Sequence, residues 1–406
     1  VAILEGHVQQ VTKLTFHPSG SLLLSGGWEG VFRMWEPSSG RQVLQFQHRL
    51  SSVSFSTDGS WAGAIQNEKG GQLLEIATCP EYRTLASSLG TAQKDFFDGG
   101  ISPDGRWLAM GTDEGVHVWE IITGREAAVL AIGRTGSAFF PPNGRELLTC
   151  GDAGLQRWPI QDRADAAQPL QLGPPQQIAL PFIPTRACQS RDGSLFVATS
   201  EPSGRALVLN SATGAEQASS VNPSACYVAL SPDGTWLATA GWHSPFLRLS
   251  NVRTGELTHE WNSDSLAGIS FTPDSRTLVV LRPEECSFWD LKTLQPTRRL
   301  RRDAPRYGSQ VAFSPDEKLM ALEVVPGVIH LTEAATGRTV AKLTDPFGDR
   351  ATWMSFTPDG TQLVTASKYD KTIHVWNLRR IRAGLKEMRL DWDWPEFSAS
   401  DPIIGR

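Results

Sequence analysis

The chain has 406 residues and a formal net charge of −5, from 38 basic and 43 acidic side chains. A net-acidic chain without basic clusters argues against nucleic acid as the main partner, and no run of about 18 apolar residues is present to span a membrane. The 37 glycines and 26 prolines favour many tight turns over long helices. Because the chain starts at Val1 rather than at Met, we expect it to be a piece of a longer protein, and we expect it in the cytoplasm.

The first unit along the chain alternates short strands with turn residues. The pattern predicts strands over Val11–Phe16, Leu22–Ser25, Val31–Trp35 and Gln42–Phe46, with a turn over His17–Gly20 between the first two. Turns of this kind combine a proline that presets φ with a small polar residue and a glycine that accepts a positive φ.

The same strand–turn–strand unit occurs nine times, at intervals of 39 to 49 residues. An apolar residue stands four positions before the last turn residue in every unit except one, where Gln189 replaces it. A repeat of about 40 to 45 residues with four short strands is typical of a propeller blade. The last turn residues, called turn markers below, are Gly20, Gly59, Gly105, Gly144, Gly193, Gly234, Ser275, Glu317 and Gly360.

The third strands share a column that is often tryptophan, namely Trp35, Trp119, Trp158, Trp289 and Trp376. Six residues before four of them stand Glu29, Asp113, Asp152 and Asp370. Together with Gly6-His7 and Ser25, these positions resemble the Gly-His, strand Ser, turn Asp and Trp-Asp positions of WD40 repeats, over essentially the whole chain. The resemblance implies an all-β propeller of four-stranded antiparallel blades. It also implies a buried hydrogen-bond network of the His, Ser, acidic and Trp side chains, which only the first unit retains in full, as His7, Ser25, Glu29 and Trp35.

Two connections between units are longer than the rest. Gly90–Gly100, which contains Phe96-Phe97-Asp98, precedes the third unit, and Leu172–Thr185, with four prolines, precedes the fifth. Proline cannot donate to a strand ladder, so we predict the second stretch to be a loop.

After Trp376 the pattern changes to helical. Asn377 can cap a helix, and Leu378, Ile381, Leu385 and Met388 recur at helical spacing among basic residues. We therefore divide the chain into a propeller over 1–378 and an amphipathic helix with a tail over 379–406. The helix could bind a partner or an acidic membrane, but packing of its apolar stripe on the propeller is the favoured interpretation. The tail is similar to the ends of bacterial WD40 arrays joined to serine/threonine protein kinases.

The ninth unit is followed by this helix, so its blade needs a fourth strand from elsewhere. We expect Val1–Leu4 to pair with the strand Ile373–Trp376 and to close one ring of nine blades. The alternative is a ring of seven blades from the third to the ninth unit, closed by Tyr82–Ala86, with the first two units left from an upstream propeller.

No catalytic signature is present: the sequence has no HExxH, Walker loop, GxSxG elbow or GxGxxG followed by a helix. We expect structural roles for His117, His330 and His374 on third strands, and for Trp61, Trp107 and Trp236 between blades. The cysteines Cys79, Cys150, Cys188, Cys226 and Cys286 are odd in number and contain no CxxC, so we expect small buried or half-buried hydrophobes rather than a zinc or disulfide framework. The sequence thus predicts no catalytic residue, no metal site and no cofactor.

The loops between fourth and first strands, and between second and third strands, open on one face of a WD40-like propeller. Arg134 and His7 fall in or beside these loops, and aromatic and arginine residues there are typical of interface hot spots. We expect a monomeric, non-catalytic scaffold or sensor that binds protein partners on this face. The alternative is a propeller enzyme acting on a small molecule at the central channel. Several convergent ionisable groups at the channel mouth would favour the enzyme. The candidate binding residues are Trp28, Trp242, His243, Arg306, Tyr307, Arg350, Lys368 and Tyr369.

Overall fold

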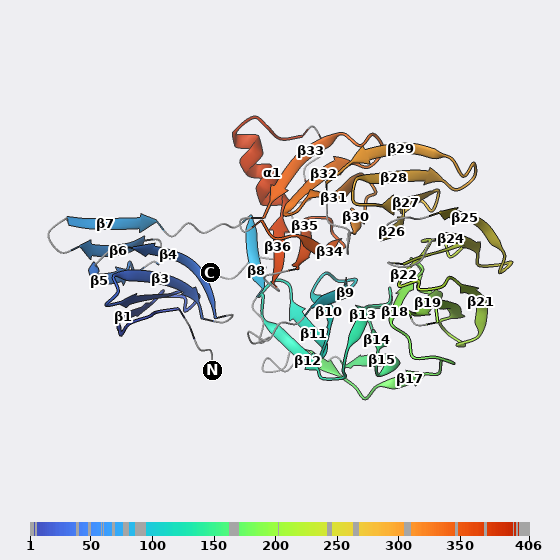
Figure 1. Cartoon of the computed structure of the whole chain (residues 1–406), viewed down its shortest axis with the longest axis horizontal. Coiled ribbons are helices and arrows are strands. Elements are labelled where there is room, and N and C mark those ends of the chain that lie inside the picture. Colours follow the sequence, from blue (N-terminus) through green and yellow to red (C-terminus); the bar gives the residue numbers. More distant parts are fainter. Residues whose placement is uncertain are drawn as a thin grey trace. The chain divides into compact units, whose positions relative to one another are not determined.

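The computed structural model describes residues 4, 6–37, 40–47, 50–57, 59, 61–66, 70–75, 81–85, 95–161, 170–201, 203–241, 246–262, 268–303, 310–345, 348–368, 372–392, 394 and 397. By its internal contacts the chain divides into two compact units, Val1–Gln93 and Lys94–Arg406. Figure 1 shows that short antiparallel sheets dominate both units.

The compact unit Val1–Gln93 contains two sheets of its own. The four-stranded sheet runs β1 (Val11–Phe16), β2 (Leu23–Gly27), β3 (Val31–Glu36) and β4 (Arg41–Gln47), and the three-stranded sheet runs β5 (Leu50–Phe55), β6 (Trp61–Gln66) and β7 (Gly70–Glu75). Each sheet is one WD40-like blade, and the second ends at β7 within the described residues.

Lys94–Arg406 begins with two blades that share one sheet, joined by a parallel pairing of β9 with β13 at Asp98 and Ser137. The first of them has β9 (Phe96–Ile101), β10 (Trp107–Thr112), β11 (Gly115–Glu120) and β12 (Glu126–Leu130). The second has β13 (Thr135–Phe139), β14 (Glu146–Gly151), β15 (Gly154–Gln161), β16 (Gln171–Leu172) and β17 (Gln176–Ile178).

Four further four-stranded blades follow in chain order. Their strands are β18 (Arg186–Gln189), β19 (Leu195–Ser200), β20 (Arg205–Asn210) and β21 (Glu216–Val221); β22 (Tyr227–Leu230), β23 (Trp236–Ala240), β24 (Phe246–Asn251) and β25 (Leu257–Asn262); β26 (Gly268–Phe271), β27 (Thr277–Leu281), β28 (Glu285–Asp290) and β29 (Pro296–Arg301); and β30 (Val311–Phe313), β31 (Leu319–Val325), β32 (Val328–Glu333) and β33 (Thr339–Thr344).

The last blade is built from β34 (Ala351–Phe356), β35 (Gln362–Ser367) and β36 (Ile373–Asn377), and its fourth strand is β8 (Tyr82–Leu85). This pairing contradicts the nine-bladed ring. In the sheet order β34-β35-β36-β8 both edges of β36 are occupied, so none is left for Val1–Leu4. The alternative of seven blades closed by the Tyr82 segment is therefore the one that the sheet order matches.

The first strands of these seven blades follow one another around a ring. β9 lies beside β13, β13 beside β18, β18 beside β22, β22 beside β26, and β30 beside β34, while β34 lies beside β9. Figure 1 shows the sheets of Lys94–Arg406 arranged one after another in this order.

The turn markers explain why the strands recur in register. All nine have a positive φ between 59° and 75°, including the non-glycine residues Ser275 and Glu317. Each marker donates its backbone N–H to the carbonyl three residues earlier, as Gly105 does to Ser102 at 2.8 Å. The residue three positions after the marker then pairs with the tryptophan column, as Leu108 does with Trp119.

Consecutive blades pack through one repeated set of positions. Within Val1–Gln93, Leu24 and Met34 of the blade β1–β4 cluster with Ala62 of the blade β5–β7, and Val53 and Phe55 pack against them. The same positions form the interface between the β9–β12 and β13–β17 blades, where Trp107, Ala109 and Val118 meet Ala138, Phe140 and Leu147. First-strand residues at the Val53 and Phe55 positions therefore face the preceding blade.

The two long connections predicted before the third and fifth repeats contain less loop than expected. Phe96 to Asp98 are the start of β9 and not part of a loop. Within the proline-rich stretch, Gln176–Ile178 pairs antiparallel with β15, because Gln176, Gln177 and Ile178 lie between its prolines and can donate to the ladder.

The predicted C-terminal helix is confirmed as α1 (Leu378–Glu387). The side chain of Asn377 caps it by accepting a hydrogen bond from the backbone N–H of Arg380 at 3.1 Å. Leu378 is fully buried and the helix lies against β35, whereas Met388 is exposed. Arg382 is also buried, where it forms a bidentate ion pair with Asp391 and lies over the ring of Trp392.

Candidate functional site

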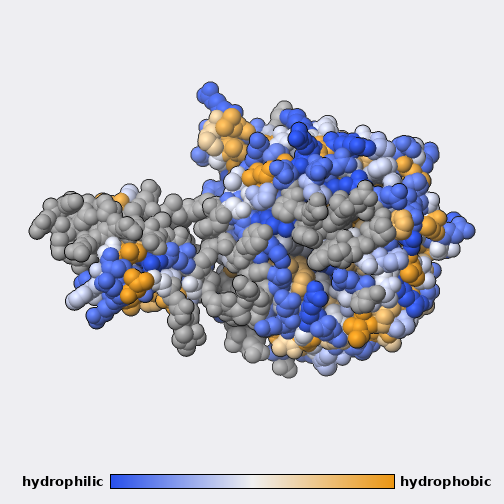
Figure 2. Space-filling view, in the orientation of Figure 1, coloured by the Kyte–Doolittle hydropathy of each residue, from blue (hydrophilic) through white to orange (hydrophobic). Residues whose placement is uncertain are grey.

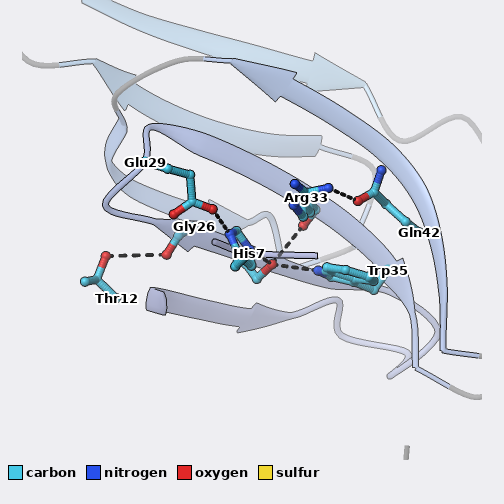
Figure 3. Close-up of polar contacts among 8 residues, drawn as sticks. His7, Thr12, Gly26, Glu29, Arg33, Trp35 and Gln42 are labelled. Atoms are coloured by element: carbon cyan, nitrogen blue, oxygen red, sulfur yellow. Dashed lines mark hydrogen bonds and ion pairs between the residues drawn. The ribbon is translucent and has the colours of Figure 1, made fainter. Parts of the chain in front are cut away.

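The first unit contains the WD40-type network that the sequence suggested (Figure 3). His7 Nδ1 contacts Glu29 Oε1, and His7 Nε2 lies 2.6 Å from the hydroxyl of Ser25. Trp35 donates its indole N–H to the same hydroxyl at 2.6 Å. Turn and strand residues thus bring all four side chains together beside β2 and β3, where they tie the segment before β1 to the blade.

Later blades keep only parts of this network. Threonine stands at the Ser25 position in three of them, and in two it accepts the indole N–H: Thr149 from Trp158 at 3.0 Å and Thr365 from Trp376 at 3.4 Å. In the β9–β12 blade, Trp119 is fully buried and stacks with His117, which contacts Glu126. Of the other two histidines expected on third strands, His374 is buried, at 1% exposure, and His330 is half-buried. Asp370 lies outside the described residues.

The centre of Lys94–Arg406 contains a cavity of about 860 Å³. Its wall is made by the first strands of the seven blades, and one column stands out, seven residues before each turn marker. Every member of that column lines the cavity: Asp98, Ser137, Arg186, Tyr227, Gly268, Gln310 and Trp353. Repetition of one register position around a ring therefore generates the inner surface.

Polar members of this column bridge blades across the cavity. Asp98 Oδ2 accepts from Arg186 Nη1 at 2.5 Å, and Asp98 Oδ1 accepts from Gln310 Nε2 at 2.7 Å. Arg186 also lies over the ring of Tyr227. Burial by itself lowers the pKa of Arg186, but the attraction of Asp98 outweighs it, so the pKa of this guanidinium is raised and the ion pair stays charged.

Charged side chains also gather at one mouth of the cavity. Lys368 Nζ lies 3.0 Å from Asp95 Oδ2, and Arg134 Nε lies 3.9 Å from Asp113 Oδ1 and over the ring of Phe97. Asp95 and Arg134 precede first strands, whereas Asp113 and Lys368 lie between second and third strands. Both classes of loop therefore reach the same opening.

Two more acidic residues of the β14–β15 and β19–β20 turns, Asp152 and Glu201, line the cavity. Asp113 and Asp152, which the resemblance placed in the network, lie at this opening, and both are exposed. Asp113 accepts the backbone N–H of Asp95 at 3.0 Å.

Three cysteines, Cys150, Cys188 and Cys226, lie at or near the cavity wall, and Cys286 is buried elsewhere. Burial raises the pKa of the Cys188 thiol to about 12 and also raises the pKa of Cys150. A thiol with so high a pKa is neutral at pH 7 and is a poor nucleophile. The expectation of buried or half-buried free cysteines agrees with these four, and Cys79 lies outside the described residues.

The predicted binding residues divide into three groups. Arg350 and Lys368 line the cavity, although Arg350 is only 4% exposed. Trp28, in the β2–β3 turn of the first unit, is 69% exposed. The others lie outside the described residues: Trp242, His243, Arg306, Tyr307 and Tyr369.

Sequence reasoning missed Asp95, Asp98, Arg186, Glu201 and Gln310. A signal for Asp98, Arg186 and Gln310 was present, because a count of seven residues back from each marker gives the cavity-lining column directly. Of the three tryptophans expected between blades, Trp107 is buried there and Trp236 is half-buried, but Trp61 is 43% exposed.

Within the described ranges, no group of three or more His, Cys, Asp or Glu side chains is placed to hold a metal ion. Over the same ranges, no helix has the length and apolar character needed to cross a membrane.

The family model for the WD40 domain, described as the WD domain, G-beta repeat, matches residues 1–36 and 337–377. Among solved structures, a chain of Kuenenia stuttgartiensis hydrazine synthase superposes with a TM-score of 0.56 at 14% identity, covering 72% of this chain and 97% of that one. At this identity the likeness shows the propeller fold alone.

Curated relatives match shorter stretches. Centriole proteome protein 16 of Chlamydomonas reinhardtii is 26% identical over 48% of this chain and 9% of its own length, and periodic tryptophan protein 2 of Saccharomyces cerevisiae is 30% identical over 28% and 13%. WD repeat and SOCS box-containing protein 1 of Mus musculus is 29% identical over 22% and 21%. The matched region thus spans less than a quarter of each relative. The chain therefore matches the WD40 repeat at its two ends, folds as a β-propeller and has WD-repeat proteins among its relatives.

Proposed function

We propose that this chain is a non-catalytic protein-interaction scaffold or sensor module that binds its partner at the charged mouth of the central cavity. WD-repeat propellers generally mediate protein interactions. The observation that carries the proposal is the convergence of charged side chains from both loop classes of several blades on one opening. Loops held by a rigid scaffold are where binding residues concentrate.

The chemistry of the mouth favours a basic partner segment. Asp152 and Glu201 make no side-chain hydrogen bond or ion pair within the described part of the chain, whereas the other three carboxylates of the cavity each contact a cation. Two carboxylates without an internal cation are available to accept from lysine or arginine side chains of a partner.

The test begins with identification, by mass spectrometry, of the protein that the chain retains, followed by titration calorimetry with variants. Asp152→Asn combined with Glu201→Gln is expected to weaken binding about tenfold or more, since a hydrogen bond to a charged group contributes about 1.5–3 kcal/mol. Glu216→Gln is the matched control, because Glu216 is an exposed carboxylate outside the cavity. Unchanged affinity in the double variant, or an equal loss in the control, would contradict the proposal.

Other predicted contacts remain part of the proposal. Trp28 is exposed, as a binding aromatic should be, and we propose it together with Trp242, His243 and the residues of the Arg306 and Tyr369 loops. Trp28→Ala should weaken binding of a partner that reaches this turn without lowering the melting temperature, because an exposed side chain contributes little to the core.

A second candidate function is an enzyme that acts on a small molecule inside the cavity. The volume of about 860 Å³ and the convergent ionisable groups favour it. Against it, Asp98 is engaged by Arg186 and Gln310, and Cys188 is a neutral thiol. Turnover of a hydrolase or oxidoreductase substrate that is abolished by Asp98→Asn would establish the enzyme instead of the scaffold.

The resemblance of the tail to bacterial WD40 arrays supports a place for this propeller beside a serine/threonine protein kinase. In that setting the mouth would hold a partner near the kinase, in the cytoplasm and as a monomeric propeller. Co-purification of a kinase with the native polypeptide would support this arrangement.

A further inference from the structure

The two blades of β1–β7 have apolar residues at their surface at positions that other blades bury. Leu14 and Phe16 of β1 are 65% and 60% exposed, and Leu73 of β7 is 73% exposed. Figure 2 shows apolar residues among polar ones on the visible face of this part of the chain.

The repeat itself shows what normally covers Leu14 and Phe16. They occupy the positions of Val53 and Phe55 in the next blade, which pack against Leu24 of the blade before. In all other blades the residues at these two positions are buried or half-buried. In the blades from β13 to β33 the apolar ones cluster with residues of the preceding blade. The fully buried examples are Ala138, Phe140, Ala187, Leu230, Phe271, Val311, Met354 and Phe356.

Leu73 marks the opposite face, the one that a blade presents to its successor. It corresponds to Met34, which is 5% exposed because the next blade covers it. The residue at this position is buried in every other blade except one, where Arg157 is half-buried. The buried residues are Val118, Val208, Leu249, Phe288, Leu331 and Val375.

The edge of the sheet β5-β6-β7 also indicates that a further WD40-like blade is the neighbour of these two blades. Its sheet ends at β7 within the described residues, whereas the blade β34–β36 receives its fourth strand from β8, which precedes that ring's first blade in sequence. An open strand edge is normally paired or covered. If the ring that contains β7 closes in the way that β8 closes its ring, the strand that pairs with β7 comes from upstream of that ring's first blade.

We propose that β1–β7 are the last two blades of a second propeller, and that WD40-like blades of the same polypeptide preceding Val1 cover Leu14, Phe16 and Leu73 and pair with β7. Two blades cannot close a ring, because propellers have typically about four to eight. The earlier blades supply the face that meets β1, the face that meets β7, and a strand that pairs with β7. This inference rests on packing in the first unit and is independent of the cavity site.

The experiment compares the 406-residue chain with the native polypeptide extended by the residues that its gene encodes before Val1. Single cysteines replace Leu14 or Leu73, and maleimide labelling is localised by mass spectrometry. In the extended polypeptide both sites should label more slowly by at least about tenfold, because a side chain packed between blades reacts only through local opening. Ala215→Cys is the control: Ala215 is exposed in the turn before β21 of Lys94–Arg406, away from both faces under test, so its labelling should be equal in the two polypeptides.

A second measurement keeps the test valid if a cysteine variant folds poorly. Leu14→Asp should lower the urea midpoint of the extended polypeptide and leave that of the 406-residue chain unchanged. Equal labelling of Leu14→Cys in both polypeptides overturns the proposal. Protection in the 406-residue chain that rises with its concentration also overturns it, because that result assigns the face to a second copy.

Discussion

Nine turn markers hold a left-handed backbone that only glycine adopts without a steric cost, and two of them are Ser275 and Glu317. The turn is therefore set by its hydrogen bond and by the flanking strands as much as by glycine. Where glycine is present, it still removes a real penalty, because a Cβ in this region crowds the following carbonyl.

We expect Gly105→Ala to lower the free energy of unfolding by about 1–2 kcal/mol, through backbone strain alone. A Cβ built there meets only Pro358 at 3.6 Å, an ordinary contact, while φ is +73°. Urea unfolding measures the change. Gly384→Ala is the control, since Gly384 lies in α1 with open space around it, and that change should stabilise the chain by about 0.5–1 kcal/mol.

The hydroxyl of Ser25 connects His7 and Trp35, each at 2.6 Å, and Trp35 is only 2% exposed. Ser25→Ala leaves the buried indole N–H without its acceptor, which should cost about 1–3 kcal/mol. Hydrogen exchange of the β2 and β3 amides measures this locally. Ser25→Thr should keep most of the protection, because Thr149 and Thr365 serve the same role in other blades; equal losses in both variants would contradict the network.

At the scale of elements, a buried charged cluster lies between the last blades of Lys94–Arg406. Glu323 of β31 is fully buried and accepts the backbone N–H groups of Ala351 at 2.8 Å and Gly327 at 3.2 Å. Arg302 and Arg350 are buried nearby. Burial raises the pKa of the Glu323 carboxyl above its usual value, although these hydrogen bonds and both arginines oppose the shift.

A raised carboxyl pKa stabilises the fold fully below the ordinary glutamate pKa, and this contribution is lost as pH rises through the folded-state pKa. The stability of the wild type minus that of Glu323→Gln should therefore fall as pH increases above about 4.5 and then level off. For Glu333→Gln the same stability difference should rise with pH, and should do so below about pH 4.5, because the hydrogen bond from Thr336 lowers the pKa of Glu333. Urea midpoints from pH 2 to pH 8 decide it, and a stability difference that changes with pH in the same direction for both residues would contradict the assignment.

Strand register was predictable, whereas ring closure was not. Turn chemistry and period-2 alternation are local, so Leu108 opposite Trp119 follows from counting. The partner of β36 is a long-range choice between two short strands, and nothing in Val1–Leu4 or in the Tyr82 segment encodes which sheet edge it meets. The ion pair of Asp98 with Arg186 was likewise hidden, because it joins two blades 88 residues apart.

At the scale of the whole molecule, the ring of Lys94–Arg406 depends on one strand from earlier in the sequence, β8, in the sheet of β36. Leu85 of β8 is 3% exposed, so Leu85→Ala should create a cavity and cost about 2–4 kcal/mol. Leu73→Ala is the matched control, since Leu73 is 73% exposed in this chain and its truncation should change stability little. Hydrogen exchange of the β36 amides distinguishes closure from general destabilisation, because loss of β8 frees one edge of β36 first. If Leu85→Ala leaves protection of β36 unchanged, then β8 does not close this ring.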